Sequence, residues 1–291
     1  MNESLIKYLA GLLDADGSLS LAFKADQNRN GHYFLGLRMS LASSVAVDKA
    51  GFVDSLPSIT EMGNFSVSGS NGQFKTWYVD KRADLEMLLP RIIKHMVIKG
   101  RHWNFLLNLW RAQRANRKTC TYDEMECMKQ QSKESRRENA GPLKPKNHPT
   151  WAWLAGYLDG DGCYSYRANV SNGYKQWTIN VSAAAHKKDA VGLEFIQKAF
   201  GGIISNQNET VIVWRRSLGY QNRDFALSFL PKLANHSRLK REKIDAMIHH
   251  HRQRLSVPGV EKNHCTIDGC ESHARGHGLC SKHYQRARRA T

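Results

Sequence analysis

The 291-residue sequence has no apolar run of the length, about 18 residues or more, that crosses a bilayer as a helix. Its first residues lack the pattern of a secretory signal peptide and that of an Arg- and Ser-rich transit segment. The six cysteines follow no pattern that demands a disulfide, which is typical of a reducing compartment. We therefore expect an intracellular protein with no membrane association. We also expect a monomer.

Acidic residues are scarce beside basic ones. The chain has 43 Lys and Arg against 26 Asp and Glu, which gives a formal net charge of +17, and its isoelectric point is near 9.7. A charge of this size is the electrostatic footprint of a polyanionic partner. Composition therefore favours nucleic acid as the partner class.

What the sequence does contain is one nine-residue motif in two copies. LAGLLDADG occupies residues 9–17 and LAGYLDGDG occupies residues 154–162. Both copies belong to segments with apolar residues at helical spacing, and Gly17 and Gly162 stand where each helix should stop. The duplication predicts two like half-domains, each of which begins with a motif helix.

The two motif helices are expected to pack against each other. Small residues recur four positions apart in both copies, Gly11 with Ala15 and Gly156 with Gly160. Such a pair gives a helix a face on which another backbone can approach closely. The ends of the two helices should therefore lie together.

Asp16 and Asp161 then lie at neighbouring helix C-termini. The helix dipole disfavours a carboxylate there by a few tenths to about 1 kcal/mol, and the two carboxylates also repel each other. Mg²⁺ would resolve this conflict because it prefers oxygen ligands. The plainer alternative is that both acids only turn the chain, but the same acid at the same place in both copies favours a metal site.

The repeat continues beyond the motifs. Pro90 and Pro231 are 141 positions apart, as are Lys99 and Lys240, while the motifs are 145 apart. Runs rich in β-forming residues lie between motif and lysine at 19–23, 33–41, 64–68, 74–79, 164–170, 177–181, 203–205 and 211–215. Apolar helical patterns separate the second and third runs of each half, at 45–56 and 190–200. Each half therefore has the order helix, two strands, helix, two strands, helix, which predicts an α+β fold.

At these residues the chain resembles the LAGLIDADG homing endonucleases, in the single-chain form with two motif copies. The resemblance implies two pseudo-symmetric αββαββα half-domains, whose antiparallel sheets form a saddle over DNA. It also implies that Asp16 and Asp161 bind the catalytic divalent metals together with the backbone carbonyls of Ala15 and Gly160. These metals would be Mg²⁺ or Mn²⁺, with Ca²⁺ as a non-cleaving substitute, and cleavage would leave a short 3′ overhang.

The resemblance also gives roles to two lysines. Lys99 and Lys240 occupy the position at which family members carry a basic residue beside the scissile phosphates. We interpret them as catalytic or near-catalytic groups that hold the water network or stabilise charge on the phosphate, with simple solvated cations as the alternative. Asp14 and Asp159 are motif acids of less certain role. The region of the family's central strand residues holds, in ambiguous register, Ser43, Ser44, His186, Lys187 and Lys188.

Basic and polar side chains occupy alternate positions of the expected strands. A β-ribbon with this spacing can place side chains in a major groove, and the alternative is a solvated sheet face. The candidate DNA contacts on the strands are Lys24, His32, Arg38, Lys75, Arg167, Lys175, Arg215 and Arg216.

The end of the chain has a different pattern. Cys265 with Cys270, and Cys280 with His283, form two short-spaced pairs on either side of a Gly-containing loop, as a tetrahedral Zn²⁺ site requires. A segment this short cannot build a core of its own, so structural zinc would supply its folding energy. Other candidates for the fourth ligand are His264, His273 and His277. The arginines that follow, expected to contact phosphates, are Arg286, Arg288 and Arg289.

These patterns divide the chain into four parts. We expect a first half-domain at 1–117, a linker at 118–150, a second half-domain at 151–256 and a zinc-binding module at 257–291. The linker is inferred from its polar, charged composition and its Gly- and Pro-rich end, and a helical beginning is an open alternative.

The sequence thus predicts a site-specific, metal-dependent double-strand DNA endonuclease that hydrolyses phosphodiester bonds. Two alternatives on the same scaffold are an RNA-binding intron maturase, which would need no intact active site, and a non-cleaving DNA-binding protein. The presence of both acids and both lysines favours the nuclease.

Overall fold

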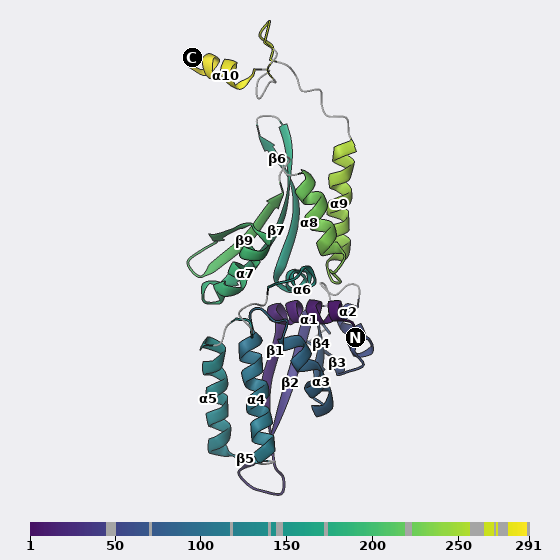
Figure 1. The fold of residues 1–291 in the computed structure, drawn as a ribbon, viewed down its shortest axis with the longest axis vertical. Coiled ribbons are helices and arrows are strands. Elements are labelled where there is room, and N and C mark those ends of the chain that lie inside the picture. The colour runs from purple at the N-terminus through teal and green to yellow at the C-terminus, as the bar shows by residue number, and fades with distance from the viewer. Residues whose placement is uncertain are drawn as a thin grey trace.

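The computed structural model describes residues 1–44, 51–69, 72–116, 119–138, 141–143, 148–171, 174–218, 223–256, 265–270, 272 and 279–289. Most of them form two α/β units of like architecture, one from each half of the chain (Figure 1). No helix in this part of the chain is both long enough and apolar enough to cross a membrane.

The first unit has the expected order of elements. These are α1 (Glu3–Asp16), β1 (Gly17–Ala25), β2 (His32–Ser44), α2 (Phe52–Thr60), β3 (Asn64–Ser68), β4 (Phe74–Val79), α3 (Arg82–Ile93) and α4 (Gly100–Asn116). The strands are antiparallel in the order β1-β2-β4-β3. The last expected helix is divided into α3 and α4 by a turn that contains Lys99. Of the helical pattern at 45–56, residues 45–50 lie outside the described residues.

The second unit repeats this order. Its elements are α6 (Trp151–Asp161), β6 (Gly162–Ser171), β7 (Tyr174–His186), the 3₁₀-helix η1 (Lys187–Asp189), α7 (Ala190–Phe200), β8 (Ile203–Asn206), β9 (Val211–Leu218), α8 (Arg223–Ala234) and α9 (Arg241–Ser256). The sheet order β6-β7-β9-β8 matches that of the first unit. The predicted α+β fold with antiparallel sheets is confirmed.

The segment expected as a linker begins with ordered structure. β5 (Thr119–Thr121) pairs with β2, and α5 (Tyr122–Glu138) follows it. A capping box starts this helix, because the Glu124 carboxylate accepts from the Thr121 N–H at 2.9 Å and the Thr121 hydroxyl accepts from the Glu124 N–H at 3.3 Å. Met125 and Met128 are buried. The first unit therefore carries a strand and a helix outside the repeated pattern.

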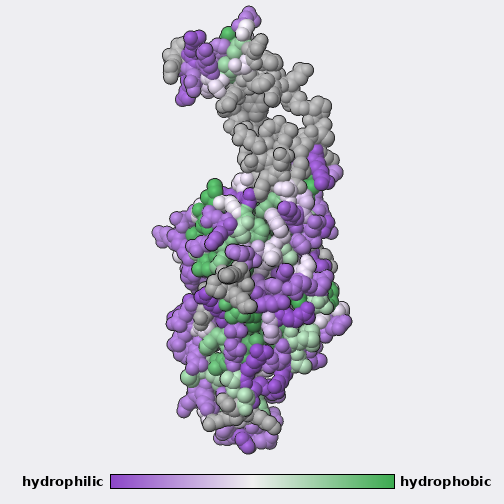
Figure 2. Space-filling model, viewed as in Figure 1, coloured by the Kyte–Doolittle hydropathy of each residue, from purple (hydrophilic) through white to green (hydrophobic). Residues whose placement is uncertain are grey.

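Each sheet has one buried face because side chains alternate along a strand. On β2, the residues Leu35, Leu37 and Met39 are buried, while Arg38 between them is exposed. Helices of the same unit cover the apolar face and complete the core. The opposite face is open and carries polar residues such as Arg38 together with the exposed Phe34. Hydrophilic residues also cover most of the surface visible in Figure 2, with smaller apolar patches between them.

α1 and α6 lie side by side between the two sheets (Figure 1). A β-carbon on Gly11 would lie 1.9 Å from the carbonyl oxygen of Trp153, and one on Gly156 would lie 2.0 Å from that of Tyr8. These distances leave no room for any side chain at either glycine. The predicted packing of the two motif helices through their small residues is confirmed.

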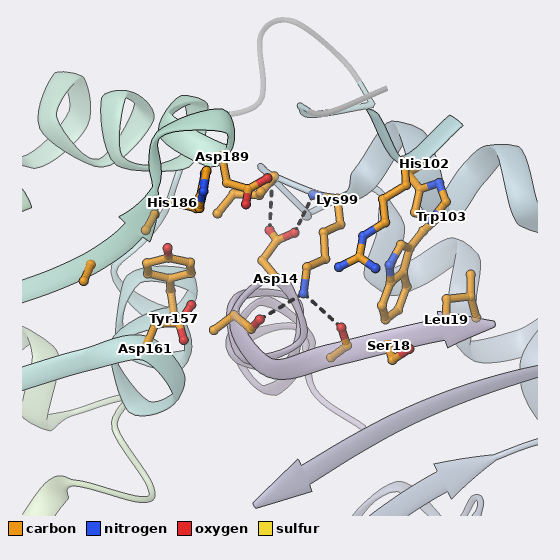
Figure 3. A pocket seen from close by; sticks show the side chains of 16 residues that line it. Asp14, Ser18, Leu19, Lys99, His102, Trp103, Tyr157, Asp161, His186 and Asp189 are labelled. Carbon is orange, nitrogen blue, oxygen red and sulfur yellow. Dashed lines mark hydrogen bonds between the residues drawn. The ribbon is translucent and has the colours of Figure 1, made fainter. Parts of the chain in front are cut away.

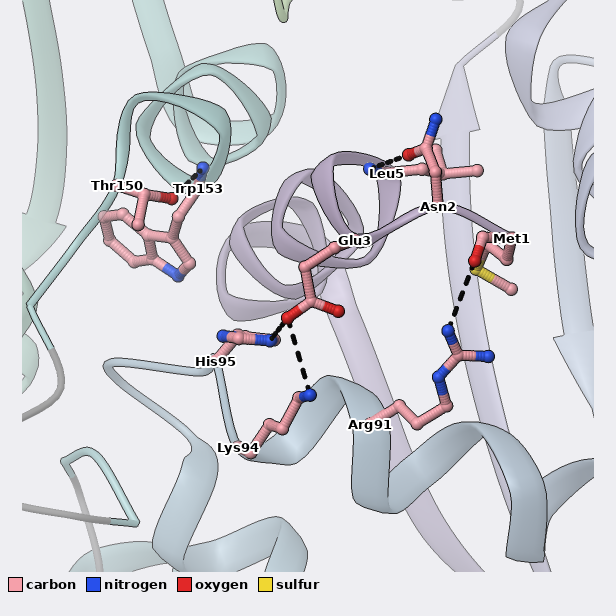
Figure 4. A network of polar contacts seen from close by, with 9 residues as sticks. All are labelled: Met1, Asn2, Glu3, Leu5, Arg91, Lys94, His95, Thr150 and Trp153. Atoms are coloured by element: carbon pink, nitrogen blue, oxygen red, sulfur yellow. Dashed lines mark hydrogen bonds and ion pairs between the residues drawn. The ribbon is translucent and has the colours of Figure 1, made fainter.

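Both motif helices begin at a capping side chain (Figure 4). Asn2 and Thr150 each accept a hydrogen bond from the backbone N–H three residues on, at 2.8 and 3.2 Å. A cap of this kind contributes about 1 kcal/mol. Next to Asn2, the Glu3 carboxylate pairs with Lys94 at 3.4 Å and His95 at 2.7 Å. These contacts connect the start of α1 to the turn that follows α3.

Candidate active site

The last acids of the two motifs lie at one end of the α1–α6 pair. Asp16 is the last residue of α1 and Asp161 is the last residue of α6. A β-carbon on Gly160 would lie 2.8 Å from Oδ2 of Asp16. The Asp16 carboxylate therefore packs against the backbone of the other motif, and a larger residue at position 160 would displace it.

The two carboxylates repel each other. Partial burial, with the charge of Asp16 as a further cause, raises the pKa of Asp161 to about 6. Partial burial also raises the pKa of Asp16, while Lys99 and Lys240 lower it. Both residues remain exposed on one side. Two neighbouring carboxylates that are open to solvent and destabilised by mutual repulsion fit the ligand preference of a hard divalent cation.

Asp14 has a structural role. Its side chain is 3% exposed, and it accepts backbone hydrogen bonds from Val97 at 2.7 Å, Ile98 at 3.2 Å and Lys99 at 2.8 Å. The indole N–H of Trp153, from the other motif helix, donates to the same carboxylate at 2.9 Å. Asp14 thus fixes the turn before α4 and connects it to the opposite half.

Asp159 repeats this arrangement in the second half. It is fully buried, and it accepts from the backbone N–H groups of Arg238 at 2.8 Å and Leu239 at 3.0 Å and from the Ser237 hydroxyl at 2.7 Å. The Tyr8 hydroxyl of α1 donates to it at 2.8 Å. In both halves, the motif acid two positions before the last orders the turn that carries the lysine.

The two lysines reach the ends of the motif helices. The Lys99 ammonium donates to the carbonyl oxygens of Leu13, Ala15 and Gly17 at 2.9 to 3.1 Å. Three such bonds use all three protons of the ammonium group. Because the C-terminal carbonyls of a helix lack partners within the helix, this cation offsets the negative end of the dipole.

Lys240 makes the equivalent set of bonds. Its ammonium donates to the carbonyl oxygens of Leu158 at 2.9 Å, Gly160 at 3.2 Å and Gly162 at 2.6 Å. Burial lowers the pKa of both lysines, and nearby acids, which include Asp16 and Asp161, oppose this shift. Two lysines therefore flank the two carboxylates.

A cavity of about 430 Å³ opens beside this cluster (Figure 3). Asp161 and Tyr157 face it from α6, and Lys99 lies at the end of α1 (Figure 3). His186, a sequence candidate of ambiguous register, also lines it at the end of β7. The cavity is therefore built from both halves and opens onto one of the paired acids.

The open sheet faces carry some of the predicted DNA contacts. Lys24 and Arg38 lie on the open face of the first sheet, and His32 has the same orientation on β2. Arg38 pairs with Asp80 at 3.0 Å. Arg215 lies on the open face of the second sheet, opposite Ser182.

Two of the predicted strand contacts point the other way. Lys75 shares a strand face with the buried Trp77 and pairs with Asp54 of α2 at 2.6 Å. Arg216 alternates with Arg215, and its guanidinium lies 5.1 Å from the ring of Phe229 on α8. The prediction of an open-face position is therefore wrong for Lys75 and Arg216, because it did not fix which strand positions face the helices. The side chains of Arg167, Lys175 and Arg289 lie outside the described residues.

The predicted zinc ligands meet at the C-terminal end. The ligand atoms of Cys265, Cys270, Cys280 and His283 all lie within 4.8 Å of one another. Sγ of Cys270 and Sγ of Cys280 are 3.9 Å apart, which is close to the sulfur separation in a tetrahedron with bonds of about 2.3 Å. The donor set therefore fits Zn²⁺. Arg286 and Arg288 lie on α10 (Ser281–Arg289), which carries His283, while the alternative ligands His264, His273 and His277 lie outside the described residues.

Sequence reasoning missed two residues of the cavity, His102 and Arg136. Both line it beside Lys99. Arg136 belongs to the segment expected as a linker, and the Thr121-x-x-Glu124 capping box was the one local signal that a helix begins there. The contacts of Tyr8 and Trp153 with the opposite half had no local signal.

The two repeated units, the packed motif helices and the paired acids define a two-motif α/β fold with one shared site. Residues 154–237 match the model of the LAGLIDADG endonuclease family. No curated protein matches the chain at a significant level. The resemblance stated from the two motifs is confirmed.

Solved structures share the fold over most of the chain. The LAGLIDADG meganuclease I-AabMI bound to uncleaved DNA is 12% identical, with a TM-score of 0.65 over 88% of this chain and 92% of that one. The homing endonuclease I-GzeII with its DNA target is 14% identical, with a TM-score of 0.63 over 86% and 91%. I-SmaMI bound to cleaved DNA is 16% identical, with a TM-score of 0.62 over 88% and 92%.

Tyr8→Phe tests the contact between the halves. It removes the bond to the buried Asp159 and should lower the free energy of unfolding by about 2 kcal/mol, the range for a hydrogen bond to a charged group. Tyr164→Phe is the matched control, because the buried Tyr164 hydroxyl has no hydrogen-bond partner in the described structure. Urea unfolding measures both, and equal losses would contradict the role given to Tyr8.

The raised pKa of Asp161 gives a pH dependence in EDTA. Because the folded-state pKa is about 6 rather than 3.8, this group favours folding below pH 4, and its contribution is lost as pH rises through 6. We expect Asp161→Asn to be more stable than the wild type by about 1 kcal/mol at about pH 7.5, allowing for solvent screening. The difference should disappear near pH 4. Urea unfolding at both pH values checks this, and a difference of equal size at both would refute it.

Proposed function

We propose that this protein is a metal-dependent, site-specific double-strand DNA endonuclease of the homing type. The observation that carries the proposal is the pair Asp16 and Asp161, held at one point by glycine-mediated helix packing and flanked by Lys99 and Lys240. A protein that only binds DNA does not need two carboxylates that repel each other, since such a pair costs stability.

Asp16 and Asp161 would hold a divalent cation, with help from the carbonyls of Ala15 and Gly160. I-SmaMI bound to its uncleaved DNA target in the presence of calcium ions has this fold, with 15% identity and a TM-score of 0.61, which supports divalent metal use here. When bound, such a cation supplies Lewis-acid polarisation of a phosphoryl oxygen and a water of lowered pKa. Mg²⁺ or Mn²⁺ would support cleavage, and Ca²⁺ would support binding alone.

The chain's own residues supply the rest of the chemistry. Lys99 and Lys240 donate all their protons to helix-end carbonyls, so their contribution is a fixed positive potential at the place where charge builds on the phosphate. Asp14 and Asp159 hold the two lysine turns in position. A carboxylate binds a divalent cation in its ionised form, which predicts weaker metal binding below the Asp161 pKa of about 6.

The open sheet faces are the proposed DNA surface. Lys24, His32, Arg38 and Arg215 are the candidates there for contacts with base edges or phosphates. DNA-bound I-AabMI and I-GzeII share this fold and support the assignment. The net charge of +17 favours the same partner.

Asp16→Asn and Asp161→Asn should each abolish double-strand cleavage while DNA affinity changes less than about threefold, since the metal site is lost and the sheet faces are intact. Asp123→Asn, remote from the site at the start of α5, is the matched control and should cut normally. The measurement is plasmid cleavage with Mg²⁺ on a target selected from a random DNA library, with binding measured in Ca²⁺. Full cleavage by either site variant would rule out the assignment.

The Cys/His cluster is proposed as a structural zinc site that presents Arg286 and Arg288 to phosphates. Elemental analysis should find about one zinc ion per chain, and Cys280→Ser should reduce it to near zero because three ligands hold zinc poorly. Cys127→Ser, which removes an exposed cysteine outside the cluster, should keep the zinc. Equal zinc content in both variants would contradict the site.

A further inference from the structure

The two halves differ at the cavity beside Lys99. His102 of α4 and Arg136 of α5 line this cavity together with Lys99 and Asp161. α5 lies outside the repeated pattern of elements. The first half therefore adds a guanidinium to the cavity that Asp161 also lines, and this group comes from a helix outside the repeat.

The end of α5 is held firmly at this place. Ser135 is 4% exposed, and its hydroxyl shares a hydrogen bond of 3.2 Å with Nδ1 of His102. In the middle of the helix, the Lys129 ammonium lies 5.6 Å from the ring of Phe23 on β1. This contact holds the backbone next to Arg136, whose side chain lines the cavity.

Arg136 has no ion pair or hydrogen bond within the described part of the chain. Its charge acts on His102 and Lys99, which line the same cavity. Burial and then the charges of Arg136 and Lys99 lower the pKa of His102 to about 4, so this imidazole is neutral at physiological pH. Arg136 also lowers the pKa of Lys99. An unpaired guanidinium close to a part-buried ammonium favours the binding of an anion.

In the part of the second half that the structure describes, no group is equivalent to Arg136. The offset of 141 residues that relates Lys99 to Lys240 places Lys243 where the first half has His102. In the described part of the chain, α9 packs against α8 and β6, and no helix takes the place that α5 has on α4. The asymmetry is thus a property of the fold and not of one side chain.

We infer that Arg136 binds a backbone phosphate of one DNA strand at the Lys99 side of the site, and that the two strands are therefore cut at unequal rates. The inference rests on the proposed endonuclease function. A planar guanidinium can donate two parallel hydrogen bonds to a phosphate and so fix its position relative to the acids. Arg136 is a positioning residue for the strand cut at the Lys99 side. The described residues of the second half offer no such group to the other strand.

The test compares Arg136→Ala with Arg137→Ala, the neighbouring exposed arginine that does not line the cavity. Each variant is incubated with Mg²⁺ and a supercoiled plasmid that carries a selected target. The cleavage rate of each strand is followed by a separate label. We expect Arg136→Ala to slow cleavage of one strand by about 10- to 100-fold, so that nicked circles accumulate, and to leave the other strand within about twofold. Arg136→Lys should recover part of the lost rate.

Wild-type protein that fails to cut with Mg²⁺ would refute the proposed function itself. If the wild type cuts, three results overturn the inference alone: equal slowing of both strands, no slowing, or the same slowing in Arg137→Ala. Thermal melting checks that each variant is folded. Replacing an exposed arginine should change the melting temperature little, so a large fall would indicate misfolding.

Discussion

The close packing of α1 on α6 is the contact on which the rest of the structure depends. Backbone meets backbone at Gly11 and Gly156, where even a methyl group would lie within 2.0 Å of a carbonyl oxygen. Only this approach brings Asp16 and Asp161 to one point. It also lets an aromatic side chain of each motif helix, Tyr8 or Trp153, donate a hydrogen bond to the buried acid of the other helix. The halves are therefore joined by polar contacts as well as by packing.

The charges at this interface are arranged in two layers. Asp14 and Asp159 are buried and saturated with hydrogen bonds, and they order the turns that carry the two lysines. The acids that end the motifs are left exposed and in repulsion, with a raised pKa at Asp161. Hydrogen bonds offset part of the cost of burying Asp14 and Asp159, whereas the exposed pair costs stability without a bound cation. A site that is unfavourable when empty binds its cation more strongly.

The repeat makes the halves alike, but α5 makes them unequal. Its buried methionines and the hydrogen bond between Ser135 and His102 attach it to the first half. A single chain with unlike halves can bind a DNA site whose two halves differ in sequence. An added helix beside one lysine therefore alters one half of the site while the shared acids stay as they are.

The sequence by itself determined the local features: two motif helices with small faces, the order of strands and helices, and a C-terminal Cys/His pattern. Periodicity and spacing are properties of neighbouring residues, so a single chain reveals them. It did not determine the side of the sheet taken by Lys75 and Arg216, since a shift of one residue reverses a strand's faces. Nor could it place Arg136 beside Lys99 or Tyr8 beside Asp159, because those contacts join residues far apart in the chain, and only tertiary packing decides them.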